Sequence, residues 1–227
     1  MTKKQTPAAP KARLDPDAVV RAALDLLDEK GADAVSLRGT ADRLGVRMNT
    51  VLWHAKTKAR LLELMADAIL AGIPLTGLPE APDERVRELA RRYRRCLLAH
   101  RDGAAVVAGT YAAEPATLAF AEHFTAALLA GGLDERRAAW TFWSIQYLVL
   151  GLTQEEQALA ASGEEHTLGP ALAAGGYPAL ARVAPHLEDT AFDERFEFGL
   201  DQLLRPHGAR AERAPQAHAH TPFHGEA

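Results

Sequence analysis

The sequence has a single cysteine, Cys96, among its 227 residues. One cysteine excludes an internal disulfide and a cysteine-rich zinc site. No apolar stretch approaches the ~20 residues that a helix needs to cross a bilayer. The stretch Met1–Pro10 is polar and lacks the apolar core of a secretion signal. We therefore expect a cytoplasmic protein that does not enter a membrane.

The sequence also lacks the local motifs of common catalytic sites, such as a nucleophile elbow, a phosphate-binding loop or a His-Glu zinc motif. The acidic and histidine groups that remain as candidates are Glu155, Glu156, Glu164, Glu165 and His166. Adjacent carboxylates on a helix do not share a face, and residues 164–166 lie in a glycine-rich segment. Further histidines near the C-terminus are irregularly spaced, at His207, His218, His220 and His224. We therefore expect no enzyme activity, no cofactor and no metal site.

Charge is divided unevenly along the chain. Residues 1–60 hold 12 Lys/Arg and 7 Asp/Glu, a net charge of +5, whereas residues 61–227 hold 14 and 23, a net charge of −9. A basic N-terminal segment followed by an acidic remainder is expected when the N-terminal segment binds a polyanion and the rest of the protein does not.

Helix signals follow one another along the chain, and no segment alternates polar and apolar residues as a half-buried strand would. Near the N-terminus the expected helix starts are Asp15-Pro16, Ser36 and Thr57, and the expected ends are Gly31 and Gly45. A short third helix is predicted at about Met48–His54.

The rest of the chain is predicted to be helical as well. Prolines and a glycine mark residues 74–82 as a connector. A long helix over 134–162 is apolar nearly all round, which predicts burial on more than one side, and a last helix covers about 188–204. We predict an all-α fold divided into a flexible basic arm (1–13), a helix-turn-helix domain (14–60), a larger helical domain (61–205) and a disordered tail (206–227).

The most informative segment is Val35–Lys58, VSLRGTADRLGVRMNTVLWHAKTK. Two short helices around a tight turn at Gly45 suit a helix-turn-helix, whose second helix enters the major groove of DNA. Such a helix presents polar side chains at its N-terminal end and keeps apolar side chains for packing. Arg47 and Asn49 meet the first requirement, and Val51 meets the second.

Three blocks of this sequence resemble the TetR family of regulators, and its tetracycline-repressor branch in particular. The first is LDPDAVVRAALDLLDEKGADAVSLRGTADRLGV, followed by the Trp53-His54 pair and by Lys56 and Lys58. The other two are CLLAHRDGAAVVAGT (Cys96–Thr110) and LGLTQEEQ (Leu150–Gln157). The resemblance spans about residues 14–205 and implies a repressor that binds double-stranded operator DNA and responds to a small-molecule inducer.

The resemblance also implies roles for residues of the helix-turn-helix. Base edges would be read by Arg38, Arg47, Met48 and Asn49. Sugar and phosphate groups would be contacted by Ser36, Thr50, Trp53, His54 and Lys58. A bidentate Arg–guanine or Asn–adenine contact is worth ~1–3 kcal/mol of discrimination, whereas phosphate contacts fix the register and make affinity fall with salt.

For the larger domain, the resemblance implies a homodimer held by a four-helix bundle, with the helices over 134–162 and 188–204 as the candidates, and a ligand pocket. The family's pocket positions fall on Leu89, Val107, Tyr111, His123 and Glu155. The metal-ligand histidine of the tetracycline repressors falls on Val107, whose side chain has no donor atom, so a magnesium–tetracycline inducer is not expected. Aromatic side chains complete the expected pocket, at Tyr93, Phe142 and Trp143, and favour a planar or hydrophobic inducer.

Two other interpretations stay open on the residues alone. A regulator of this kind can activate its promoter instead of repressing it. A binding module that has lost DNA recognition would keep the fold, but it would not need the basic residues Arg38, Arg47, Lys56 and Lys58.

Overall fold

The computed structural model describes residues 15–110, 113–162, 169–173 and 175–205. Across these ranges the chain is helical and contains no strand, which confirms the predicted all-α class. The helices are α1 (Pro16–Lys30), α2 (Leu37–Leu44), α3 (Met48–Ala55), α4 (Lys58–Ala71), α5 (Pro82–Leu98), α6 (Gly103–Ala108), α7 (Pro115–Ala130), α8 (Glu135–Ser162), α9 (Gly169–Ala173), α10 (Pro178–Leu187) and α11 (Phe192–Leu204), with a 3₁₀ turn at Ala32–Ala34. The predicted arm and tail lie outside the described residues.

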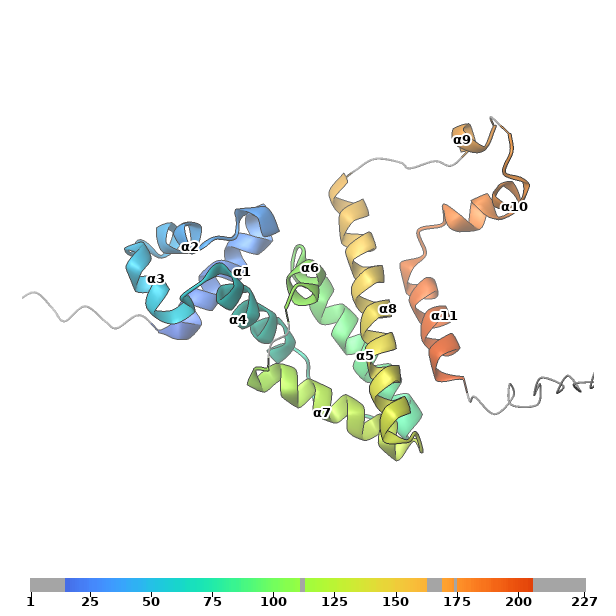
Figure 1. Cartoon of the computed structure of the whole chain (residues 1–227), viewed down its shortest axis with the longest axis horizontal. Coiled ribbons are helices and arrows are strands. Elements are labelled where there is room, and N and C mark those ends of the chain that lie inside the picture. The colour runs from blue at the N-terminus through green and yellow to red at the C-terminus, as the bar shows by residue number, and fades with distance from the viewer. Residues whose placement is uncertain (1–14, 111–112, 163–168, 174, 206–227) are drawn as a thin grey trace, which may run out of the picture.

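Helices α1, α2 and α3 form a small unit at one end of the molecule, here called the head (Figure 1). The predicted caps are the ones used. Ser36 Oγ accepts a hydrogen bond from Gly39 N at 3.0 Å at the start of α2, and Thr57 Oγ1 accepts one from Arg60 N at 3.1 Å at the start of α4. Gly45 ends α2 at φ 63°, in the left-handed region that favours glycine. Local capping therefore fixes the angle between α2 and α3.

Gly39 has a packing role that its helix propensity does not suggest. A Cβ atom at this position would lie 3.0 Å from Leu26 Cδ2 and 3.1 Å from Ser36 Oγ. The missing side chain lets α2 approach α1 closely.

The larger unit, here called the body, is built from α5 to α8 and α11 (Figure 1). Its core includes Leu89 on α5, Phe120 and Phe124 on α7, Ile145 on α8 and Leu200 on α11, all nearly or fully buried. Helices α9 and α10 lie away from this core (Figure 1). None of the helices in the described part of the chain is long and apolar enough to span a membrane.

Three expectations for the body need correction. α8 is not buried on several sides in the single chain, because Trp140 and Tyr147 are 58% and 64% exposed. The last helix begins at Phe192 instead of Glu188, since Asp189 Oδ1 accepts a hydrogen bond from Ala191 N and holds a turn there. The short helices α6, α9 and α10 were not predicted at all, because a helix of 5 to 10 residues is too short to show a clear repeat of apolar residues.

Helix α4 joins the head to the body. It packs on α1 in the head and on α6 and α7 in the body. The Asp67 carboxylate accepts hydrogen bonds from Thr117 N at 2.7 Å and Thr117 Oγ1 at 2.9 Å, and so binds the first turn of α7. Arg60 forms ion pairs with Glu63 on its own helix and with Glu114, the residue before α7. The predicted domain boundary at residue 60 thus falls inside a helix that both units share.

Candidate nucleic-acid interface and ligand site

The outer face of α3 carries large side chains that no other described part of the chain covers. Trp53 is 85% exposed and Met48 is 44% exposed, and Arg47 and Asn49 are exposed as well. The inner face holds Val51, which is fully buried in the head. Trp53 therefore does not pack beneath the helix, and its indole is available to a partner.

The other DNA-contact residues predicted from the sequence lie on α2, on α3 and at the start of α4. Arg38 on α2 and Lys58 at the start of α4 are exposed, whereas Thr50 and His54 on α3 are half-buried. Ser36 is half-buried, and its oxygen already caps α2, which leaves the hydroxyl proton free to be donated. Eight of the nine predicted residues thus lie on α2, α3 or their caps, and the ninth, Lys58, begins the next helix.

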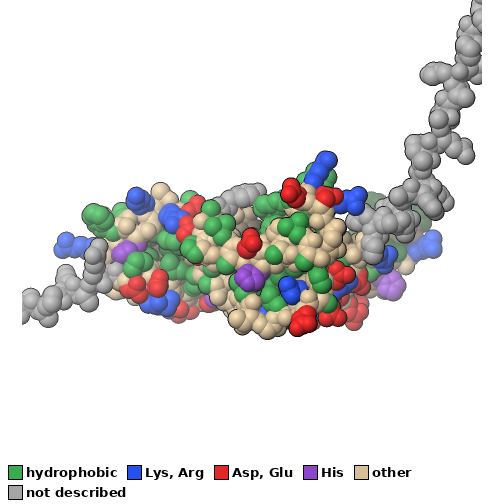
Figure 2. Space-filling model, turned by 90° about the horizontal axis from the view of Figure 1, so that it is seen from below, with side chains coloured by type: hydrophobic (Ala, Val, Ile, Leu, Met, Phe, Trp, Pro, Cys, Tyr) green, Lys and Arg blue, Asp and Glu red, His purple; other side chains and the backbone are tan. Residues whose placement is uncertain are grey.

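A shallow hollow runs along the surface of α3. Asn49, Leu52, Trp53 and Lys56 line it. Figure 2 shows Lys and Arg side chains together with hydrophobic ones at this end of the molecule. Lys56, which was not among the predicted DNA contacts, adds a cation beside the indole.

Ion pairing separates the cations of the head into two sets. Arg43 is held by Glu29 at 2.7 Å and by Asp25 at 3.4 Å, and it joins α2 to α1. The hydrogen bonds between the two side chains lower the pKa of Glu29 and raise the pKa of Arg43. By contrast, no acidic group of the described chain pairs with the second set, which comprises Lys30 at the end of α1 and the four cations on or beside α2 and α3, Arg38, Arg47, Lys56 and Lys58. Cations without internal partners on one surface suit the phosphate backbone of DNA.

A second contact, besides α4, ties the head to the body. Asp102, in the left-handed region at φ 55°, accepts a hydrogen bond from Ala32 N at 2.8 Å. His100 Nδ1 lies 3.1 Å from Asp28 Oδ2, and Arg101 N donates to Asp28 Oδ1 at 3.1 Å. The loop between α5 and α6 therefore binds the end of α1 directly.

The pocket positions expected from the family resemblance are only partly brought together. Leu89 and Tyr93 on α5 are buried in the body, and burial raises the pKa of Tyr93. His123 on α7 is exposed, with Nδ1 2.9 Å from the carbonyl oxygen of Ala119. Tyr111 lies outside the described residues.

The remaining pocket positions lie along α6 and α8. Val107 and Phe142 are half-buried, and Trp143 is 42% exposed. The Glu155 carboxylate is exposed and faces Arg195 on α11 at 3.7 Å. The Val107 side chain has no atom that can coordinate a metal, and the Glu155 carboxylate faces Arg195. These residues therefore do not fit a magnesium chelate.

A continuous row of aromatic rings passes through the body. Ring centroids lie 5.1 Å apart between Tyr93 and Phe120, 5.6 Å between Phe120 and Phe124, and 5.5 Å between Phe124 and Phe142. The row then reaches the surface of α8, where Trp143 contacts both Phe142 and Tyr147 at 5.8 Å. The predicted aromatic positions are thus linked through Phe120 and Phe124, two rings that were not among them.

Thr153 on α8 is a candidate that sequence reasoning missed. The residue is fully buried, and its Oγ1 has no hydrogen-bond partner among the described residues. A buried hydroxyl without a partner costs free energy and calls for an explanation, such as a ligand or a water. Its place on the buried stripe of α8, among Val149 and Ile145, was the available signal.

Helices α8 and α11 present an aromatic surface on the outside of the body, here called the outer aromatic face. Its members are Trp140, Trp143 and Tyr147 on α8 and Phe198 on α11, which are 42–67% exposed. The two helices lie very close, because a Cβ atom on Gly199 would come within 2.8 Å of Leu148 Cδ1. Exposed apolar patches of this kind mark interaction sites.

Two family models match the chain in order. The one described as "Bacterial regulatory proteins, tetR family" matches residues 19–65, which cover most of the head and the start of α4. The one described as "Tetracyclin repressor-like, C-terminal domain" matches residues 78–207, more than half of the chain. The chain belongs to the TetR family. It is a TetR-family transcriptional regulator, of a class that is generally non-enzymatic and binds DNA, with a helix-turn-helix domain followed by a larger helical domain.

Individual relatives agree with this assignment. The tetracycline repressor protein class G of Vibrio anguillarum is 35% identical over 196 residues, which cover 85% of this chain and 92% of the relative. A possible TetR family regulator of Streptomyces coelicolor A3(2) has a similar crystal structure, with 38% identity, a TM-score of 0.73 and coverage of 83% of this chain and 96% of the other.

Two further solved structures hold partners. ActR of Streptomyces coelicolor, in complex with (S)-DNPA, has 28% identity and a TM-score of 0.75 over 85% of this chain and 96% of ActR. BioQ of Mycobacterium smegmatis, solved with its double-stranded DNA operator, has 26% identity and a TM-score of 0.61 over 84% of this chain and 98% of BioQ.

Proposed function

We propose that this TetR-family regulator is a homodimeric repressor that binds palindromic operator DNA through α3 and is released by a small, aromatic or hydrophobic molecule. The observation that carries the proposal is the outer face of α3, where Arg47, Asn49 and Trp53 are exposed beside cations without internal partners. Arg47 and Asn49 have the donors and acceptors that read guanine and adenine in the major groove. Trp53 and the cations would contact the sugar–phosphate backbone.

The outer aromatic face supports the homodimer. A two-fold interface uses the same surface on both subunits, so two copies of α8 and α11 would form a four-helix bundle over the exposed rings. Such a dimer presents two heads to two half-sites about one turn of DNA apart, ~34–36 Å, which is why the operator should be palindromic.

The aromatic row supports a hydrophobic inducer. It runs from the buried Tyr93 to the surface at Trp143, and the unpartnered Thr153 hydroxyl adds a polar group inside the body. Inducer binding would release DNA only to the extent that the ligand prefers the arrangement of heads that does not fit the operator. The hydrogen bonds between the α5–α6 loop and the end of α1 would transmit that change from the body to the head.

The direct test is a titration against fluorescently labelled DNA from just upstream of the gene, with an unrelated fragment of equal length, at two salt concentrations. We expect at least ~10³-fold preference for the upstream fragment. Because a dimer loses two such contacts of ~1–3 kcal/mol each, Arg47→Ala and Asn49→Ala should each lower that affinity at least roughly 30-fold. Lys30→Ala, which removes an exposed cation from the far end of α1, is the matched control and should bind as the parent does.

The result against the proposal would be a folded protein that selects no sequence, either from the upstream fragment or from a random DNA pool. A reporter gene behind the operator separates repression from activation, because the protein should lower its expression. Aromatic compounds screened against the complex then test release.

A further inference from the structure

Gln157, near the end of α8, uses its whole side-chain amide on the α5–α6 loop and its two flanking helix ends. Its Nε2 donates to the carbonyl oxygens of Leu97 at 3.1 Å and His100 at 2.8 Å. Its Oε1 accepts a hydrogen bond from Ala104 N at 3.3 Å. A glutamine amide has two N–H donors and one carbonyl oxygen, so all of its groups are engaged. One side chain of α8 therefore binds the last turn of α5, the loop and the first turn of α6.

The loop that Gln157 binds is a tight turn over residues 99–102. Leu97 O also accepts from His100 N at 3.3 Å, and His100 O also accepts from Gly103 N at 3.0 Å. A Cβ atom on Gly103 would collide with Leu97 O, so only glycine lets the chain turn this closely. Because the turn has little freedom to change shape, a residue that fixes one side of it fixes the other side as well.

The other side of the loop holds the end of α1. The Asp102 carboxylate accepts a hydrogen bond from Ala32 N at 2.8 Å, and Arg101 N donates to the Asp28 carboxylate at 3.1 Å. A continuous chain of hydrogen bonds thus leads from Gln157 on α8, through the loop, to the head.

The two attachments of the head to the body have different mechanical effects. Helix α4 is shared by both units, and a head held by α4 alone could pivot about it. The loop holds a second helix, α1, and so removes that rotation. In the proposed dimer α8 belongs to the central bundle, and Gln157 therefore fixes each head relative to the dimer interface. Two heads bind one operator together only if their separation and rotation match the half-sites.

We propose that Gln157 is a positioning residue that sets which spacing of operator half-sites this regulator accepts. It reads no base and acts by holding the α5–α6 loop, and through it α1, in place relative to α8. The inference rests on the proposed function, because spacing matters only for two heads on one operator. A head that is free to pivot takes up the fitting arrangement only part of the time, which weakens binding to the best operator and raises tolerance for other spacings.

The first test measures the spacing preference of the full-length protein. Labelled operators with identical half-sites are titrated at the best spacing and at spacings one base pair shorter and longer. One base pair moves a half-site by ~3.4 Å and turns it by about 35°. The wild type should lose at least about 30-fold in affinity on either change, and Gln157→Met should reduce that loss to less than about fivefold. The loss caused by a mismatched base within a half-site should stay as in the wild type, because base reading is intact.

Gln154→Met is the matched control. Gln154 is half-buried on the same helix, as Gln157 is, but its side chain makes one long hydrogen bond, to Ala104 O at 3.5 Å. This variant should keep the spacing preference of the wild type. Gln157→Glu keeps the shape and the acceptor but loses both donors, and it decides the question if Gln157→Met does not fold. A folded Gln157 variant with the wild-type spacing preference would overturn the proposal.

A second measurement needs no DNA and so separates this inference from the proposed function. The amides of Ala32 and Arg101 should exchange hydrogen at least about tenfold faster in Gln157→Met, relative to the amide of Phe124 in the core of α7, as measured by NMR. Unchanged relative exchange would show that Gln157 does not hold the head. A wild type that binds no operator would overturn the proposed function and the role in spacing with it, whereas the exchange result would still show whether Gln157 is linked to the head.

Discussion

The head and the body each expose large aromatic side chains, but the neighbours of these rings differ. Trp53 on α3 stands beside Lys56 and near Arg47 and Lys58, none of which is paired within the described chain. Tyr147 on α8 has only uncharged neighbours one turn away along the helix, at Trp143, Ser144, Leu150 and Gly151. Exposure alone marks both as interaction surfaces, and charge distinguishes the partners that we propose: a polyanion for the head and an apolar copy of the same surface for the body.

The largest effect is expected from a charge on the outer aromatic face. Tyr147→Glu places a carboxylate on the surface where the two copies of the proposed dimer would meet, and an unpaired buried charge is strongly unfavourable. We expect the dimer dissociation constant to rise by at least about 100-fold, as measured by sedimentation equilibrium. Leu118→Glu is the control, because Leu118 is an exposed leucine on α7 away from this face. A Tyr147→Glu variant that stays dimeric would place the interface elsewhere.

A glutamate in place of the exposed ring of the head should weaken DNA binding and leave dimerisation unchanged. Trp53→Glu adds a negative charge beside the DNA backbone and removes the indole, so operator affinity should fall more than about tenfold in anisotropy titrations. The dimer dissociation constant should stay as in the parent. Loss of dimerisation in Trp53→Glu would show that the two surfaces are not independent.

A smaller effect is expected from Lys58→Gln. Each phosphate contact contributes about 0.9 to the slope of log affinity against log salt concentration. Because a dimer loses two lysines, the slope should flatten by about two, while the preference for the operator sequence stays nearly unchanged. Lys30→Gln should leave the slope as it is. An unchanged slope in Lys58→Gln would remove Lys58 from the interface.

The smallest effect concerns the ion pair that holds α11 on α5. Arg91 binds Glu197 at 2.6 and 2.8 Å and lowers the pKa of the Glu197 carboxyl below its usual 4.5. The pair therefore stabilises the fold above the unfolded pKa, and this contribution is lost as pH falls through the lower folded pKa.

Because both side chains are about 40% exposed, Glu197→Gln should cost less than about 1 kcal/mol at pH 7. Thermal unfolding from pH 7 down to pH 3 should show the difference from wild type shrinking toward zero. Glu194→Gln, at an exposed position on the same helix, should show no such trend. A difference that is independent of pH would point to packing and not to charge.

The sequence predicted the head better than the body, and the reason is physical. Ser36, Gly45 and Thr57 act on the backbone within three or four residues, so their effect can be recognised locally. The exposed rings of α8 were misjudged because an apolar helix face looks the same whether its own chain or a second chain covers it.

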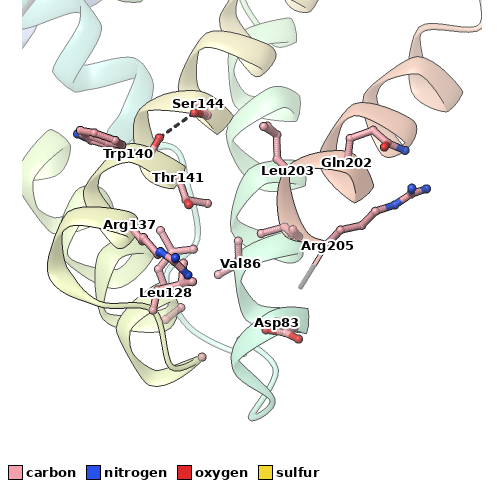
Figure 3. Close-up of a pocket in the computed structure, with 14 residues that line it drawn as sticks. Asp83, Val86, Leu128, Arg137, Trp140, Thr141, Ser144, Gln202, Leu203 and Arg205 are labelled. Carbon is pink, nitrogen blue, oxygen red and sulfur yellow. Dashed lines mark hydrogen bonds between the residues drawn. The ribbon is translucent and has the colours of Figure 1, made fainter. Parts of the chain in front are cut away.

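The hollow around Trp140 and Arg137, where the ends of α5, α7, α8 and α11 meet (Figure 3), was not predicted for a similar reason. Its walls come from four helices whose ends meet only in the folded chain, and no spacing along the sequence reveals such a meeting. Thr153 could have been noticed, since a hydroxyl on a buried stripe is a local signal.

The hydrogen bond from Ala32 N to Asp102 joins residues 70 positions apart. During synthesis the head leaves the ribosome first, yet the end of α1 acquires this partner only after the α5–α6 loop has followed. Contacts within α1–α3 are local and form fast, whereas this closure awaits the body. A fragment that stops at the end of α4 would thus leave Asp28 and Ala32 without their hydrogen-bond partners Arg101 and Asp102. The end of α1 would then be less firmly held in the isolated head than in the whole chain.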